Sequence, residues 1–170
     1  EIANKIRINT VKEVYYAQSG HPGGSLSIAD ILAVLYFKEM KTDPKNPKDE
    51  NRDRFVLSKG HCSPALYATL ALKGFFSMDE LKNFRNINSI LQGHPDMKKI
   101  PGVDMSTGSL GQGLSAANGM AIAGKLDKKD YRVYAILGDG EIEEGQVWEA
   151  AMASAKYKLD NLCIFVDNNN

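Results

Sequence analysis

The residues most suited to chemistry are an aspartate between two glycines, Asp139, and a run of asparagines at 168–170. Carboxylate and carboxamide oxygens are ligands that Mg²⁺ accepts, and Mg²⁺ usually keeps waters and phosphate oxygens as its other ligands. Gly138 and Gly140 allow the backbone to approach a bulky anion. The pattern therefore fits a metal ion that bridges a phosphate ester or diphosphate to the protein. Gly-Asp-Gly is also common turn chemistry, and asparagines are also typical of solvated loops. The residues alone leave both interpretations open.

The sequence contains three histidines, His21, His61 and His94, and each follows a glycine. We expect all three to lie in turns at strand or helix ends and to form one cluster of imidazoles that faces a pocket. Imidazole donates hydrogen bonds to hydroxyl and carbonyl oxygens and moves protons near neutral pH. A three-histidine zinc site is the competing interpretation, which is disfavoured because no two histidines share a helix face.

Other polar residues near these positions have simpler explanations. Glu141 and Glu143 are interpreted as carboxylates at the start of a helix, where the helix dipole favours negative charge. Cys62 next to His61 resembles a Cys–His nucleophile, but a small buried side chain fits that position better. Trp148 is expected in the core.

The segment 131–170 has the pattern of a strand–helix–strand unit. Apolar runs at 132–137 and 162–166 predict two buried strands, and a helix is expected around 148–156. A crossover of this length favours parallel strands with a right-handed connection. Because the carboxyl ends of parallel strands meet at the edge where open α/β sheets bind ligands, Asp139 and Asn169 should lie close together.

Upstream of this unit, the patterns predict helices over 2–18, 27–40 and 65–73, a short helix that opens at 77, and one buried strand over 54–58. The segment 41–53 contains two prolines and no large apolar residue, so it is expected to be an exposed connection. The long loop 86–107 is a candidate binding loop. It leads into a helix of small residues after Gly113, which would allow another element or a cofactor to pack closely.

Composition is that of one globular domain of 170 residues, with 43% hydrophobic residues and a formal net charge of zero. The balanced charge gives no indication of a nucleic-acid or anionic-membrane partner, and no apolar run reaches the length of a membrane span. Cys62 and Cys163 lack zinc or redox spacing, which makes a reduced, cytoplasmic location the default. Because the chain stops just past a strand, we expect a single domain over residues 1–170 that is incomplete at its C-terminus.

Five motifs resemble the transketolases and occur in the same order as in that family. They are SGHPG at 19–23, RDRFVLSKGH at 52–61, GHP at 93–95, TGSLGQG at 107–113, and GDGEIEEGQVWEAA at 138–151 followed by YKLDN at 157–161. The Gly-Asp-Gly with an asparagine nearly thirty residues later also resembles the thiamine-diphosphate motif of a wider class of enzymes. The resemblance covers nearly the whole chain. It implies a three-layer α/β fold of the thiamine-diphosphate-binding kind, with a mainly parallel sheet.

The resemblance also implies a cofactor site. Asp139 and Asn169 would be ligands of Mg²⁺ (or Ca²⁺), Asn169 and Gly140 would lie against the diphosphate, and His61 would lie beside the diphosphate and the substrate. In the family a third metal ligand is a backbone carbonyl two residues after the asparagine, a position beyond residue 170. The segment formed by Gly108, Ser109 and Leu110 would be a backbone and apolar wall along the cofactor.

Catalytic roles follow from the same resemblance. His21 and His94 would contact the sugar near the reacting carbon and assist its proton transfers. Glu144 matches the glutamate of the family's Glu-Gly pair, which belongs to an acidic network that links two active sites across a dimer, and Glu149 is a further candidate member. The implied reaction, part of the pentose phosphate pathway, transfers a two-carbon ketol unit from a ketose phosphate to an aldose phosphate.

In these enzymes a second, pyrimidine-binding domain of the partner subunit supplies a glutamate that protonates the aminopyrimidine. We therefore expect this chain alone to be inactive. It would be the first subunit of a split, two-subunit transketolase or a section of a longer one, and would act in a homodimer or heterotetramer.

Three alternatives remain. A relative could make deoxyxylulose phosphate or use another sugar phosphate, although the motifs at His21 and His94 speak against deoxyxylulose chemistry. A non-catalytic partner that binds the cofactor or stabilises a dimer would not need three histidines and Asp139. A Mg-dependent phosphohydrolase would require a second carboxylate paired with Asp139, and Gly140-Glu141 does not supply the usual spacing.

Overall fold

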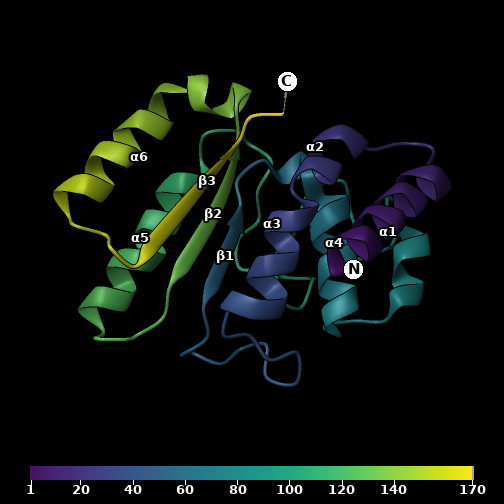
Figure 1. Ribbon diagram of the computed structural model, residues 1–170, viewed down its shortest axis with the longest axis horizontal. Helices are drawn as coiled ribbons and strands as arrows, with labels where there is room; N and C mark the ends of the chain where they lie inside the picture. Colours follow the sequence, from purple (N-terminus) through teal and green to yellow (C-terminus); the bar gives the residue numbers. More distant parts are fainter. Residues whose placement is uncertain (170) are drawn as a thin grey trace.

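The computed structural model describes residues 1–169 and has a parallel sheet between two layers of helices (Figure 1). The strands are β1 (Arg54–Leu57), β2 (Val133–Gly138) and β3 (Leu162–Asp167), in the order β1-β2-β3. On one face lie α5 (Gly113–Leu126) and α6 (Gly145–Lys156). On the other lie α1 (Ile2–Ala17), α2 (Pro22–Ser27), α3 (Ala29–Val34) and α4 (Ser63–Lys73). The three-layer α/β prediction is confirmed.

Short helical turns connect these elements. A π-helical turn (Leu35–Glu39) follows α3, and 3-10 turns cover Gly60–Cys62, Met78–Asn83 and Gly140–Glu143. Among residues 1–169 no helix is long and apolar enough to cross a membrane.

The helix predicted over 27–40 is present as α3 and the π-helical turn, which together cover residues 29–39, and α2 before it was not predicted. Ser27 does not cap the following helix. Its hydroxyl instead donates to Asp167 Oδ2 at 2.5 Å. The hydroxyl that the local pattern predicts as a helix cap therefore contacts the distant strand β3.

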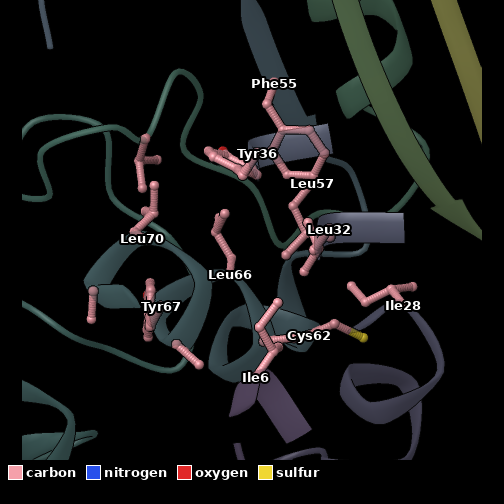
Figure 2. Close-up of a cluster of buried hydrophobic side chains, with 14 of the residues drawn as sticks. Ile6, Ile28, Leu32, Tyr36, Phe55, Leu57, Cys62, Leu66, Tyr67 and Leu70 are labelled. Atoms are coloured by element: carbon pink, nitrogen blue, oxygen red, sulfur yellow. The ribbon is translucent and has the colours of Figure 1, made fainter. Parts of the chain in front are cut away.

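Two apolar clusters lie on opposite faces of the sheet, as the alternation of strand side chains requires. Phe55 and Leu57 point into the larger cluster with the helices α1, α3 and α4 (Figure 2). Tyr134 and Ile136 belong to the same cluster. Val56, Val133, Ala135 and Leu137 point into the cluster with α5 and α6. The small residues of α5 pack against the sheet and neighbouring chain. A Cβ on Gly124 would lie 2.9 Å from the Tyr131 ring.

Two expectations about burial are wrong. Cys163, Ile164 and Val166 of β3 are exposed, because this strand pairs with β2 on one side only in the described part of the chain. Trp148 is 59% exposed, since it lies on the outer face of α6, where its Nε1 donates to the Ile142 carbonyl at 2.8 Å.

Candidate active site at the carboxyl edge of the sheet

The carboxyl ends of β2 and β3 bring the predicted metal ligands to one edge. Gly138 pairs with Asp167 in the parallel register, and the Asp139 backbone N–H donates to the Asp167 carbonyl at 3.1 Å. Asp139 follows β2 and is half-buried, while Asn169 follows β3 and is exposed. The Asn169 side chain lies 3.4 Å from Ser27 Oγ. Asn170, the last asparagine of the run, lies outside the described residues.

The edge is open beside Gly140. No atom of residues 1–169 outside the immediate neighbours of Gly140 lies within 4 Å of the position that a Cβ on it would occupy, and the residue is exposed. An anion can therefore approach the backbone of the turn that follows Asp139.

Below this edge lies a buried ion pair that the sequence analysis missed. Lys59 Nζ pairs with the Asp167 carboxylate and also donates to the Gly24 carbonyl at 2.9 Å. The exposed fractions of the two side chains are 2% and 10%. The pair joins the segment after β1 to the end of β3 and to α2. The sequence feature that could have indicated this buried ion pair is the position of Lys59 directly after the predicted buried strand 54–58.

Glu141 lies in the first turn of the 3-10 helix Gly140–Glu143, as expected for a helix-start carboxylate, but it is also a buried acid, which the sequence analysis did not predict. Its side chain accepts hydrogen bonds from Ser58 Oγ at 2.5 Å, from Gly111 N at 2.9 Å and from Gly138 N at 3.0 Å. The residue is 2% exposed. It thus connects the ends of β1 and β2 to the loop 107–113. Glu143, by contrast, is exposed, and it too lies in the first helical turn, as expected.

Two histidines lie in direct contact beside this edge. The His21 and His61 rings are 5.1 Å apart in an edge-to-face arrangement. His61 is half-buried and His21 is exposed. Since their elements, the turn before α2 and the turn after β1, are far apart in sequence, tertiary packing brings the two imidazoles together.

His94 lies in the same region, because its ring packs against Gly108 and Gly108 packs against Gly60. A Cβ on Gly108 would lie 2.8 Å from His94 Cδ2, and a Cβ on Gly60 would lie 2.7 Å from the Gly108 backbone nitrogen. The loop 107–113 is thus packed between the His94 loop and the turn that carries His61. Substitution of either glycine would push these segments apart.

Burial and neighbouring charge favour the neutral form of two imidazoles. Burial lowers the pKa of His61, with further lowering by His21 and Lys59. Burial likewise lowers the pKa of His94, followed by the positive charge of Arg85 and by His21. A neutral imidazole can accept a proton through one ring nitrogen while the other donates a hydrogen bond, and the imidazolium that results can return the proton, which suits general acid–base work.

The predicted cofactor wall lies beside the edge. Ser109 and Leu110 are exposed, and Gly108 has the positive φ of 144° that glycine tolerates. The neighbouring Gly111 packs against Glu144, because a Cβ on Gly111 would lie 2.9 Å from Glu144 Cβ. Glu144 precedes α6 and is exposed.

Two alternative sites receive no support. Within residues 1–169 no three His, Cys, Asp or Glu side chains are grouped as the ligands of one metal ion, which argues against three-histidine zinc. Cys62 is fully buried, and burial raises the pKa of its thiol, which argues against a Cys–His nucleophile.

Glu13 is another buried acid that the sequence analysis missed. It is fully buried on α1, neither carboxylate oxygen has a hydrogen-bond partner in the described part of the chain, and burial raises its pKa well above 4.5. The signal was its place on the helix face that also carries the buried Ile6 and Thr10.

Comparison with known proteins places this geometry in context. The family described as "Transketolase, thiamine diphosphate binding domain" matches residues 1–170. A 6-deoxy-6-sulfo-D-fructose transketolase subunit of Clostridium sp. (strain MSTE9) is 53% identical over 167 residues, which are 98% of this chain and 61% of that protein. One of the apulose-4-phosphate transketolase subunits of Phocaeicola vulgatus is 50% identical over 98% of this chain and 59% of its own length.

Longer proteins match as well. Human transketolase is 51% identical over 170 residues, which are 99% of this chain and 27% of the human protein. The crystal structure of transketolase from Campylobacter jejuni superposes with a TM-score of 0.95 at 42% identity, over 100% of this chain and 28% of that one. The chain thus spans about three fifths of the two subunits and about a quarter of the longer enzymes.

Proposed function

This chain belongs to the transketolase family, and we propose from that premise that it is the diphosphate-binding part of a transketolase. The complete enzyme would transfer a two-carbon ketol unit from a ketose phosphate to an aldose phosphate. The observation that carries the proposal is that Asp139 and Asn169 directly follow two paired strand ends at one sheet edge, next to three converging histidines.

The edge carries two oxygen-bearing side chains that suit Mg²⁺ (or Ca²⁺) bound together with thiamine diphosphate. The Asp139 carboxylate and the Asn169 carboxamide would hold the metal, and the open backbone at Gly140 would face the diphosphate. Thiamine diphosphate, when bound, supplies the carbanion-stabilising centre for breaking a carbon–carbon bond beside a carbonyl. His61 would lie beside the diphosphate, and Gly108, Ser109 and Leu110 would border the cofactor.

The remaining roles fall to exposed side chains. His21 and His94 would donate hydrogen bonds to sugar hydroxyl and carbonyl oxygens and move protons there. Glu144, packed against Gly111, would join an acidic network across a subunit interface, with Glu149 as a further member.

The proposal includes a partner. A pyrimidine-binding domain would come from a second subunit, as the subunit names of two relatives suggest, or from a C-terminal section of a longer protein. The assembly would be a homodimer or heterotetramer in the cytoplasm. Those same names point to different sugars, so the substrate could be a pentose phosphate of the pentose phosphate pathway or another sugar phosphate.

Calorimetric titration of thiamine diphosphate into the assembled protein tests the cofactor site. We expect binding that requires Mg²⁺ and that weakens at least about tenfold in Asp139→Ala, while the exposed Glu143→Ala control binds as the parent does. If the assembled protein binds no thiamine diphosphate, the enzyme proposal fails and a scaffold role takes its place.

A ketol-transfer assay with and without the second subunit tests the need for a partner. We expect turnover only in the assembly. Full turnover by the isolated chain would refute the split arrangement.

A further inference from the structure

Arg85 links the two loops that carry His21 and His94. Its Nη1 donates to Ser19 Oγ at 2.8 Å, two residues before His21. Its backbone N–H donates to the Leu91 carbonyl at 2.8 Å, in the loop that leads to His94. The residue has φ of 62°, a left-handed conformation that is uncommon for a side chain of this size. Such conformations persist where the surrounding contacts fix them.

The side chains of Phe84 and Arg85 also support the glycine before each histidine. A Cβ on Gly93 would lie 3.0 Å from Arg85 Nη2, and a Cβ on Gly20 would lie 3.3 Å from Phe84 Cε1. The Arg85 guanidinium lies 5.5 Å from the centre of the buried Phe84 ring. One dipeptide therefore packs beneath both Gly-His turns.

The His94 loop is independently fixed to α4. Ser63 Oγ donates to the Gly93 carbonyl at 2.9 Å, and Tyr67 OH donates to the Gln92 carbonyl at 2.8 Å. Because the His94 loop is held in place, the hydrogen bond from Arg85 to Ser19 fixes the turn that carries His21 relative to that loop.

We propose that Arg85 is a positioning residue that sets the relation between His21 and His94 for proton transfer at the sugar. The inference rests on the proposed function, in which these two histidines act on the substrate. Arg85 also adds positive charge beside His94. The groups that influence His94 are Arg85 and His21, and both lower its pKa, after the larger effect of burial.

Four variants of the assembled enzyme separate geometry from charge. Arg85→Met removes the bond to Ser19 and the charge, and Arg85→Lys keeps the charge without the planar fork. Ser19→Ala removes the bond alone. Lys82→Met is the matched control, because Lys82 is a basic residue three positions before Arg85, in the 3-10 turn Met78–Asn83, and is exposed.

We expect Arg85→Met to lower kcat about tenfold to a hundredfold, since small displacements of catalytic groups have effects of this size. The acid limb of its pH profile should move to higher pH, because loss of a nearby positive charge raises the pKa of His94. Arg85→Lys and Ser19→Ala should lower kcat less and leave the acid limb in place. Lys82→Met should match the parent in both measurements.

Histidine NMR provides a readout that does not depend on activity. In the full chain, the Cε1–Hε1 signals of His21 and His94, assigned with single His→Gln variants, should both shift in Arg85→Met. The His94 titration midpoint should rise. Ser19→Ala, the milder change, should shift the His21 signal without raising that midpoint.

Unchanged signals of both histidines in folded Arg85→Met and Ser19→Ala would overturn the inference. So would equal shifts in Lys82→Met. If the parent assembly transfers no ketol group, the proposed function fails, and the NMR result still decides whether Arg85 couples the two loops.

Discussion

Two sets of polar residues at the carboxyl edge differ in what surrounds them. The buried polar layer consists of Ser58, Lys59, Glu141 and Asp167, which bond to one another or to backbone groups. The exposed rim consists of His21, His94, Asp139 and Asn169, which are exposed or half-buried. Asp139 and Glu141 are two residues apart and belong to different sets. The difference shows that residue type near a strand end does not decide whether a carboxylate holds the fold or faces a ligand.

The stability of the protein is sensitive to substitutions in the buried polar layer, because the charges of this layer are shielded from water. A buried polar network stabilises a structure when each member has a partner, and leaving one member unpaired is unfavourable. The rim lacks this constraint, since water can replace any partner that is lost. Variants in the buried layer should therefore lower the free energy of unfolding. Variants at the rim should leave it nearly unchanged and weaken ligand binding instead.

The largest effect is expected for Lys59→Met. This change leaves Asp167 buried without its cation, and breaking a buried pair in this way destabilises a protein by about 3–5 kcal/mol. Urea unfolding measures the loss. Arg7→Met breaks the exposed pair with Asp30 and should stay within about 1 kcal/mol. Equal losses in the two variants would mean that the buried layer has no special role.

Glu141→Gln should follow in size. The amide keeps the shape of the side chain but replaces one acceptor oxygen by a donor that faces a hydroxyl or backbone N–H. The expected loss is about 2–3 kcal/mol in the free energy of unfolding. Glu143→Gln, two residues away and exposed, should change it by less than about 0.5 kcal/mol. If Glu141→Gln leaves the free energy of unfolding unchanged, the result would contradict the hydrogen bonding described above.

Glu13→Gln should stabilise the chain at pH 8 by about 1 kcal/mol. The raised pKa means that the folded state binds a proton at Glu13 more tightly than the unfolded state does. Stability from this group is therefore fully present below pH 4.5 and is lost as the pH rises through the folded pKa. Thermal unfolding of both proteins from pH 4 to pH 8 should show a gain only at the higher values. A gain that is independent of pH would rule out this explanation.

The smallest change in stability is expected for Asp139→Asn. The half-buried carboxylate lies at the rim, so the free energy of unfolding without cofactor should change by less than about 0.5 kcal/mol. The same variant should lose Mg-dependent binding of thiamine diphosphate. If it unfolds as readily as Glu141→Gln, Asp139 belongs with the buried layer.

Local pattern was sufficient for much of the framework. The apolar runs at 54–58 and 132–137 were placed within a residue of β1 and β2, because short apolar runs bounded by polar residues are typical of strands buried on both faces. The parallel arrangement followed from the length of the connection before β3. The π-helical turn at Leu35–Glu39 was missed, because the apolar periodicity of 27–40 fits a continuous helix equally well.

The sequence by itself determined that Asp139 and Asn169 follow neighbouring strands and that each histidine follows a glycine. Only the tertiary structure decided that Glu141 is buried, that Lys59 pairs with a residue 108 positions away, and that Arg85 joins two histidine loops. The physical reason is that strand ends and turns follow from neighbouring residues. The partner of a charge instead depends on which distant segments the sheet and its helices bring together.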